Sequence, residues 1–544
     1  MTQPLAPPRH PGFESARVAA AAAAFGAFAL ALGRFFIGTL ALTFAAAWLS
    51  ARALSRSPRT SRLVARAFLF PDPRVAAPID HVTVGSAAGL VLFLAALFLP
   101  AWRTPPPLMP IYDDHEWTSL NIAAARAECG AASSTPDVDV AERLSGRSDV
   151  DTPIRDIASF SCGSVRPLVI TQNTLMLIEA TVLRVNPRAS LATIARTLLA
   201  IQFAGLALFA MALCIAGVPT VWSALLLFGS HTLIWALLDQ YMYAAYPLMI
   251  PAVAGLIAIA TIGVRARSTP AQLTVAVVLG FAIGPVVNLR TDLLPACGAV
   301  IGLWLLTAPS PARAACQLLI IGAGAAGFQV VAIRPIQNAQ PQRLTGHPVL
   351  HPIVLALAVP ENPVATSLGI EWDDTVGFDL AHRIEPGVHV MTPDYERVLR
   401  RYYVGLWRER PGDMAGIYWL KFRAAARSIA VDSTAIGFDG QFWRGVLRPL
   451  TVGTGGWPVP LLFGIGVIAG AITLRRTSHS WTLPLTLFVT AGAINWLESV
   501  VVFSHFTPQY FGLAFVALFA CCLALYQFVW QCAWWPMMRS GFPE

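Results

Sequence analysis

Long apolar runs separated by short polar connections fill most of this sequence. A run of roughly 20 apolar residues is long enough to cross a bilayer as one helix. The pattern therefore predicts an all-α polytopic membrane protein with about 10–12 transmembrane helices. The run at 18–50 accommodates one helix or two, and the others lie at 84–102, 191–217, 220–237, 244–264, 271–289, 293–307, 315–333, 457–474, 480–506 and 510–530.

Basic residues in the connections predict how these helices are oriented. Six arginines against one aspartate lie between residues 52 and 74, and an excess of positive charge marks the cytoplasmic side. The run at 84–102 then crosses outward and delivers 103–166 as a first outer loop. Segment 167–185 mixes apolar residues with glutamine, asparagine and glutamate, which suits a helix lying at the interface. If that segment does not cross, the later basic connections stay cytoplasmic.

Four parts of the chain follow from this topology. Residues 1–83 hold an N-terminal membrane helix or hairpin and a basic cytoplasmic loop, and 84–333 form a transmembrane core. Residues 334–450 form a second outer segment, and 451–544 hold the C-terminal transmembrane helices. Charged residues are only 12% of the chain, about half the usual share in soluble domains, which excludes a soluble fold. The net charge of +8 is spread over short connections, which argues against a nucleic-acid partner.

The strongest chemical signal is an acidic cluster in the first outer loop. Asp113, Asp114, His115 and Glu116 follow soon after the outward-crossing run. Adjacent carboxylates repel each other, so either a cation lies nearby or one pKa rises toward the range of a general base. Asp113, Asp114 and Glu116 are therefore also candidate ligands for a divalent metal. The alternative interpretation is an ordinary solvated loop.

Other ionisable residues fall near the outer ends of predicted spans, where charges usually face a cavity or a partner rather than lipid. Arg290 and Glu498 are the strongest of these, since Glu498 interrupts an apolar run. The other candidates for substrate binding are Arg196, Asp239 and Arg334, together with His115 and Glu116 of the acidic cluster.

Two residue pairs in the outer segments have open interpretations. His347 and His351 would share one face of a helix and could bind a metal or a phosphate. The prolines that follow each histidine favour ordinary loop residues instead. Cys129 and Cys162 lie in the first outer loop, and they are disulfide candidates if that side is oxidising.

The arrangement resembles the C-type (GT-C) superfamily of integral membrane glycosyltransferases, which use sugars carried on polyprenyl phosphates. Such enzymes have an acidic motif in the first outer loop just after a membrane helix, where this chain has Asp113-Asp114-His115-Glu116. The stretch from Arg166-Pro167-Leu168 to Arg196-Thr197-Leu198 resembles the family's Pro-containing helix along the membrane, followed by an Arg-led span. The resemblance implies Asp113 or Asp114 as the catalytic base and a glycan, lipid or protein as acceptor.

A transfer of this kind would invert the anomeric configuration of the sugar in one displacement. The negative charge on the departing phosphate must be stabilised. Arg290, Arg334 or Arg196 could stabilise it, or else Mg²⁺ or Mn²⁺ held by the acidic cluster, and the sequence leaves this choice open. The Arg-rich, Lys-poor composition indicates a GC-rich bacterial genome, hence a cytoplasmic membrane with the site facing the periplasm. The alternatives are a transporter or flippase of a lipid-linked or polar substrate and a non-catalytic envelope assembly protein.

Overall fold

The protein is helical throughout the part of the chain that the computed structural model describes. Seven helices in this part are long and apolar enough to cross a membrane, and it contains no β-strand. The chain is therefore an all-α, multi-pass membrane protein, as expected. The run at 18–50 lies outside the described residues. These residues are 79–105, 123, 126–127, 150–157, 173–241, 245–266, 268–335, 349–390, 392–431, 457–476, 481–502, 512–514, 516–518 and 520–521.

The observed helices follow the apolar runs to within a few residues. Two shorter apolar helices, α13 (Leu294–Leu305) and α22 (Pro458–Arg476), account for two further runs. A 3₁₀ turn, η1 (Thr291–Leu293), leads into α13. The seven candidate spans are α4 (His81–Arg103), α9 (Leu191–Ala216), α10 (Thr220–Tyr241), α11 (Tyr246–Arg265), α12 (Thr269–Leu289), α14 (Pro311–Phe328) with its π-helical end η2 (Gln329–Ile333), and α23 (Thr482–Val502).

Polar caps fix where several spans begin. The Asp80 side chain accepts a hydrogen bond from the Thr83 amide at 3.0 Å, and this satisfies one of the free amides in the first turn of α4. Serines play the same part at the starts of α9, α12 and α14. Gly217 ends α9 with φ at 90°, a left-handed conformation that glycine adopts without a steric penalty.

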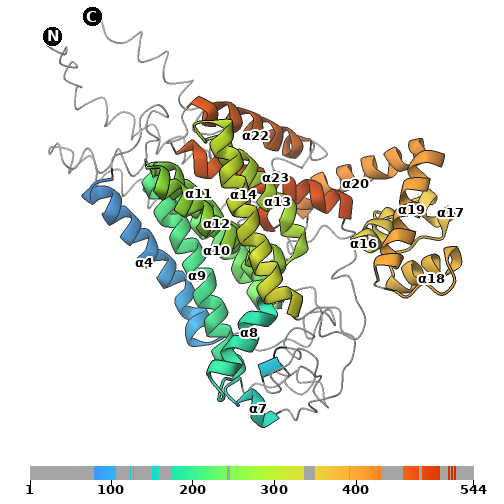
Figure 1. The fold of residues 1–544 in the computed structure, drawn as a ribbon, viewed down its shortest axis with the longest axis horizontal. Helices are drawn as coiled ribbons and strands as arrows, with labels where there is room; N and C mark the ends of the chain where they lie inside the picture. The colour runs from blue at the N-terminus through green and yellow to red at the C-terminus, as the bar shows by residue number, and fades with distance from the viewer. Residues whose placement is uncertain are drawn as a thin grey trace, which may run out of the picture.

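Two contacts between spans show which helix ends lie together. Arg196 Nε on α9 donates to the carbonyl of Trp102 on α4 at 3.3 Å, so α9 begins where α4 ends. Arg265 Nη2 at the end of α11 donates to the carbonyl of Ile215 near the end of α9 at 2.6 Å. The segment between α4 and α9 therefore starts and finishes at one end of the bundle. Its helices α7 (Ile154–Ile157) and α8 (Asn173–Val185) lie at that end (Figure 1).

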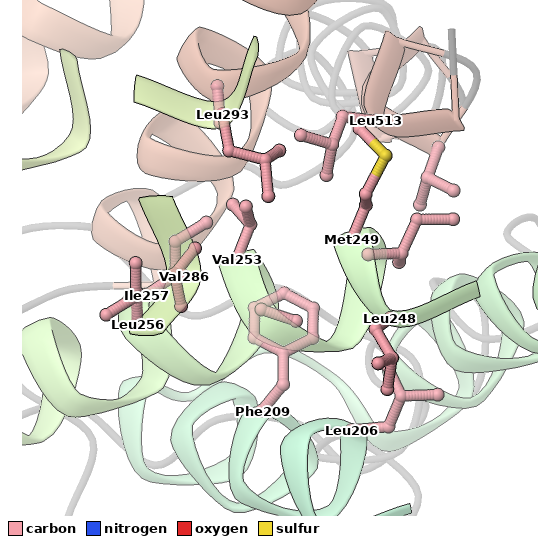
Figure 2. Close-up of a cluster of buried hydrophobic side chains, with 14 of the residues drawn as sticks. Leu206, Phe209, Leu248, Met249, Val253, Leu256, Ile257, Val286, Leu293 and Leu513 are labelled. Atoms are coloured by element: carbon pink, nitrogen blue, oxygen red, sulfur yellow. The ribbon is translucent and has the colours of Figure 1, made fainter. Parts of the chain in front are cut away.

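Small residues allow the spans to approach closely. On α9, Gly205 lies against the backbone of Pro251 on α11, where a Cβ atom would overlap the Pro251 carbonyl. A Cβ atom at Gly280 of α12 would lie 2.9 Å from the carbonyl oxygen of Ile321 on α14. Contacts between small residues are a common basis of helix association in membranes. Figure 2 shows the apolar core beside these contacts, where Phe209, Leu248 and Met249 lie among side chains from neighbouring helices.

The segment 334–450, which the sequence predicts to lie on the outer side, contains a helical unit, which we call the small domain and define as residues 349–431. Figure 1 shows it to one side of the bundle, with its last helix, α20, running back toward α23. Two apolar clusters hold it together, and Tyr395 and Met414 are buried in them. Its helices are α16 (Leu350–Leu355), η3 (Ala356–Ala358), α17 (Pro363–Leu368), α18 (Asp374–Ile384), α19 (Pro393–Glu409) and α20 (Pro411–Val431).

A buried lysine connects α20 to η3. Lys421 is 0% exposed, and its Nζ donates to the carbonyl of Ala356 at 2.7 Å. Burial lowers the pKa of Lys421 from 10.5 to about 7, because the charged amine is poorly solvated there.

The stability of the small domain is expected to rise with pH because of this lysine. Between pH 7 and 10.5 the unfolded chain holds a proton on Lys421 that the folded chain lacks, and stability rises with pH wherever the unfolded state binds more protons. Unfolding temperatures measured from pH 7 to 9 should therefore rise in the wild type relative to Lys421→Met. Parallel curves for the two proteins would contradict this assignment.

Candidate functional site

A buried ion pair lies at the junction of α12 and η1, at the end of the bundle where α4 finishes and α9 begins. Arg290 Nε lies 2.9 Å from Asp292 Oδ2 and 3.1 Å from Oδ1, so the carboxylate orients the guanidinium. The guanidinium carbon also lies 4.2 Å from the ring centroid of Tyr246, which is the first residue of α11. Asp292 is only 7% exposed. A charged pair in this position has a fixed geometry and little competition from water.

Glu498 of α23 adds a second carboxylate to this region. It lies close enough to interact electrostatically with Asp292 and Arg290, because α23 packs against η1 and α13. Its Oε2 atom is buried and has no hydrogen-bond partner among the described residues. An oxygen buried in this way is costly, so a hydroxyl or another donor from a bound molecule would be stabilised there. We call Arg290, Asp292, Tyr246 and Glu498 the charged cluster.

An apolar cavity of about 280 Å³ lies between α8, α9, α11 and α12. Its wall includes Ile201, which is 39% exposed on the outer surface of α9. Thr174 of α8 also lines it, and its hydroxyl donates to the carbonyl of Pro285 at 2.7 Å. The remaining lining is mainly aliphatic, so the cavity suits a hydrocarbon chain.

The apolar cavity and the charged cluster lie close together. Leu289 lines the cavity and immediately precedes Arg290, while Leu248 lines it two residues after Tyr246. A molecule with an apolar chain and a polar head could therefore contact both. The charged cluster lies at the end of the bundle from which the chain leaves α4 toward the acidic cluster 113–116, and the acidic cluster itself is outside the described residues.

The other residues named from the sequence fall in several places. Arg196 contacts the end of α4, and Arg334 is exposed just after η2. Asp239 belongs to the last turn of α10. Of the expected binding residues, the structure brings Arg290 and Glu498 together. Asp113, Asp114, His115, Glu116, His347, Cys129 and Cys162 lie outside the described residues.

His351 differs from the loop residue that its neighbouring prolines suggested. It lies in α16 and is only 4% exposed, since Pro352 occupies the first helical turn, where no amide donor is needed. Its Nε2 lies 2.9 Å from Asp374 Oδ1, and its Nδ1 is hydrogen-bonded to the Tyr395 hydroxyl. Burial raises the pKa of Tyr395, and the charges of Asp374 and Glu396 add to this effect. The phenol therefore keeps its proton and donates a hydrogen bond to His351 Nδ1, and the Nε2–H group of the histidine donates a hydrogen bond to Asp374.

Replacing His351 with leucine is expected to destabilise the small domain by about 1–3 kcal/mol, because the buried Tyr395 hydroxyl loses its partner. Thermal unfolding or limited proteolysis of the purified protein measures this effect. Tyr395→Phe is the matched control, and the double variant should lose less stability than the sum of the single losses. An unchanged unfolding temperature in His351→Leu would show that the hydrogen-bonded pair is unimportant.

Three buried polar side chains inside the spans were missed by the sequence reasoning. Gln202 on α9 and Asn495 on α23 have no hydrogen-bond partner for either side-chain polar atom among the described residues. His231 on α10 packs its ring against Phe98 of α4, with centroids 5.0 Å apart. Each interrupts an apolar run, and this was the available signal.

Similarity to known proteins does not assign this chain to a family. No protein-family model and no curated protein matches this chain. Among solved structures, the chain is similar to the crystal structure of ArnT from Cupriavidus metallidurans in the apo state, with 12% sequence identity and a TM-score of 0.31. The match covers 78% of this chain and 85% of ArnT. A similarity this low says nothing about activity.

Proposed function

We propose that this protein is a GT-C-type membrane glycosyltransferase that transfers a sugar from a polyprenyl-phosphate donor to an envelope glycan, lipid or protein. The observation that carries the proposal is the charged cluster beside an apolar cavity, at the end of the bundle where α4 finishes, shortly before the acidic cluster in the sequence. A lipid-linked sugar has the matching order of groups, because its apolar chain joins a phosphate and then a sugar.

Each part of the site has a role that follows from its chemistry. The apolar cavity receives part of the lipid chain, and Arg290 pairs with the phosphate through its guanidinium, which Asp292 holds in place. The unpartnered Glu498 oxygen accepts a hydrogen bond from a sugar hydroxyl. Because Asp292 already balances the charge of Arg290, the arginine acts mainly through oriented hydrogen bonds.

In the transfer step, Asp113 or Asp114 removes the proton from the acceptor hydroxyl. The acceptor oxygen forms a bond to the anomeric carbon as the bond from that carbon to the phosphate oxygen breaks. The electron pair leaves with the lipid phosphate, and one displacement inverts the anomeric configuration. Arg290 stabilises the charge that develops on the phosphate.

A divalent cation is an alternative source of that stabilisation. Among the described residues, no group of three histidine, cysteine or acidic side chains is placed to hold a metal ion. Asp113, Asp114 and Glu116 remain the proposed ligands if Mg²⁺ or Mn²⁺ takes part, since carboxylates suit both ions. The cation would then neutralise the leaving phosphate.

We further propose that the protein lies in a bacterial cytoplasmic membrane with the charged cluster facing the periplasm. The charge asymmetry of residues 52–74 supports this orientation. Sugar transfer from radiolabelled polyprenyl-phosphate sugars by the purified protein in proteoliposomes tests the proposed function. Product formation from at least one donor is expected.

A transporter or flippase is the second candidate, and the buried polar side chains Gln202, His231 and Asn495 favour it. Uptake of lipid-linked or polar compounds into the same proteoliposomes distinguishes the two candidates. Uptake without any transfer, and its loss in Gln202→Leu, would support transport.

A further inference from the structure

The last helix of the small domain, α20, has two different faces. Met414, Ile417 and Lys421 are buried against the small domain. On the other side, Trp419 and Leu420 are 47% and 40% exposed. Exposed apolar side chains that gather into one continuous patch mark a surface that contacts a partner or a membrane.

Aromatic contacts place this helix at the edge of the membrane-spanning bundle. The ring of Phe422 packs edge-on against Trp496 of α23, with centroids 5.0 Å apart. Trp496 lies six residues before the end of α23, which corresponds to roughly 9 Å at 1.5 Å per residue. The α20 helix thus meets α23 close to the end of a span, where hydrocarbon gives way to headgroups.

A second contact joins the exposed face of α20 to the exposed apolar surface of α22. Trp419 lies 5.3 Å from Trp457 between ring centroids, and Trp457 immediately precedes α22. From there α22 exposes one row of aliphatic side chains at helical spacing, including Leu461 and Ile465. The row continues through Ile468 and Ile472, so the apolar surface runs without a break from the bundle onto α20.

Two arginines complete the exposed face of α20. Arg423 and Arg427 are exposed, and neither forms an ion pair with a residue that the structure describes. The acid of α20, Asp413, lies near the opposite end of the helix. Tryptophan and leucine beside unpaired arginines are typical of helices that lie in the membrane interface and attract anionic lipids.

We propose that α20 lies in the membrane–water interface on the outer side of the same membrane that the bundle spans. Trp419 and Leu420 insert among the acyl chains, and Arg423 and Arg427 bind anionic phospholipid headgroups. This contact fixes the small domain against the bilayer beside the charged cluster. It does not depend on the proposed glycosyltransferase activity, because it follows from the contacts of α20 with α22 and α23.

Site-specific lipid crosslinking of the full-length protein tests this placement. A benzophenone amino acid replaces Leu420, and the protein is irradiated in nanodiscs that contain equal amounts of phosphatidylglycerol and phosphatidylcholine. The same substitution at Leu461 of α22 is the positive control, and at the exposed Asp379 of α18 the negative control. We expect lipid adducts at 420 and 461 and none at 379. Adducts at 461 but none at 420 would overturn the proposal.

The headgroup preference is tested in the same protein. Arg423→Gln and Arg427→Gln should each lower the ratio of phosphatidylglycerol to phosphatidylcholine adducts at position 420 by about fivefold, while the ratio at 461 stays unchanged. Both arginines are exposed, and gel filtration checks that the variants stay folded. An unchanged ratio at 420 in the double variant would refute binding of anionic headgroups.

Discussion

Replacing Arg290 with glutamine is expected to lower the rate of sugar transfer by about 100-fold, the usual effect of removing one oriented donor from a developing negative charge. The guanidinium is held by Asp292 at 2.9 Å and by the ring of Tyr246, and glutamine cannot reproduce this planar, charged arrangement. Initial rates of transfer from a lipid-linked donor measure the loss. The decrease should appear in kcat more than in KM, because the charge on the phosphate grows in the transition state.

This substitution also leaves Asp292 buried without its cation, which by itself destabilises a protein by about 3–5 kcal/mol. The double variant Arg290→Gln/Asp292→Asn removes both charges, and it separates folding from catalysis. We expect the double variant to unfold near the wild-type temperature and to remain about 100-fold slower. If the double variant transfers sugar at the wild-type rate, Arg290 has only a structural role.

Filling the apolar cavity is expected to raise KM for a long-chain donor by about tenfold. Ala252 on α11 and Ala282 on α12 both line the cavity, and leucine at either position would occupy space needed by the lipid chain. Excluding about two methylene groups from an apolar site costs about 1.6 kcal/mol, which corresponds to slightly more than a tenfold change. A short-chain donor that does not reach the cavity should keep its KM.

Ala315→Leu is the matched control for this experiment, because Ala315 is exposed on α14 and does not line the cavity. Comparing the two donors across the three variants distinguishes a lipid-chain site from a general packing defect. Equal KM changes for long-chain and short-chain donors in Ala252→Leu and Ala282→Leu would refute the assigned role of the cavity.

The spans were predictable because their signal is local. A bilayer requires about 20 apolar residues in one helix, and α9 and α12 begin at serine caps that stand just before the apolar runs. The expectation that 167–185 does not cross came from its glutamine, asparagine and glutamate and from the positions of the later arginines, and it stays a prediction.

Contacts between residues that lie far apart in the sequence were harder to predict from it. Arg290 and Glu498 were selected because both lie near predicted span ends and Glu498 interrupts an apolar run, but their proximity depends on how α23 packs against η1 and α13. The interpretation of His351 as a loop residue was wrong, because its burial depends on Asp374 and Tyr395, which come later in the chain. Local turn residues contain no information about such partners.

The acidic cluster provides the most direct test of the central claim. Purified wild type, Asp113→Asn and Asp114→Asn are each checked for folding and then compared for transfer of sugar from a panel of radiolabelled polyprenyl-phosphate donors. The proposed function predicts transfer by the wild type and its loss in at least one folded variant, because an amide cannot accept the hydroxyl proton. Equal transfer by all three proteins would contradict the catalytic assignment, and no transfer from any donor would contradict the glycosyltransferase itself.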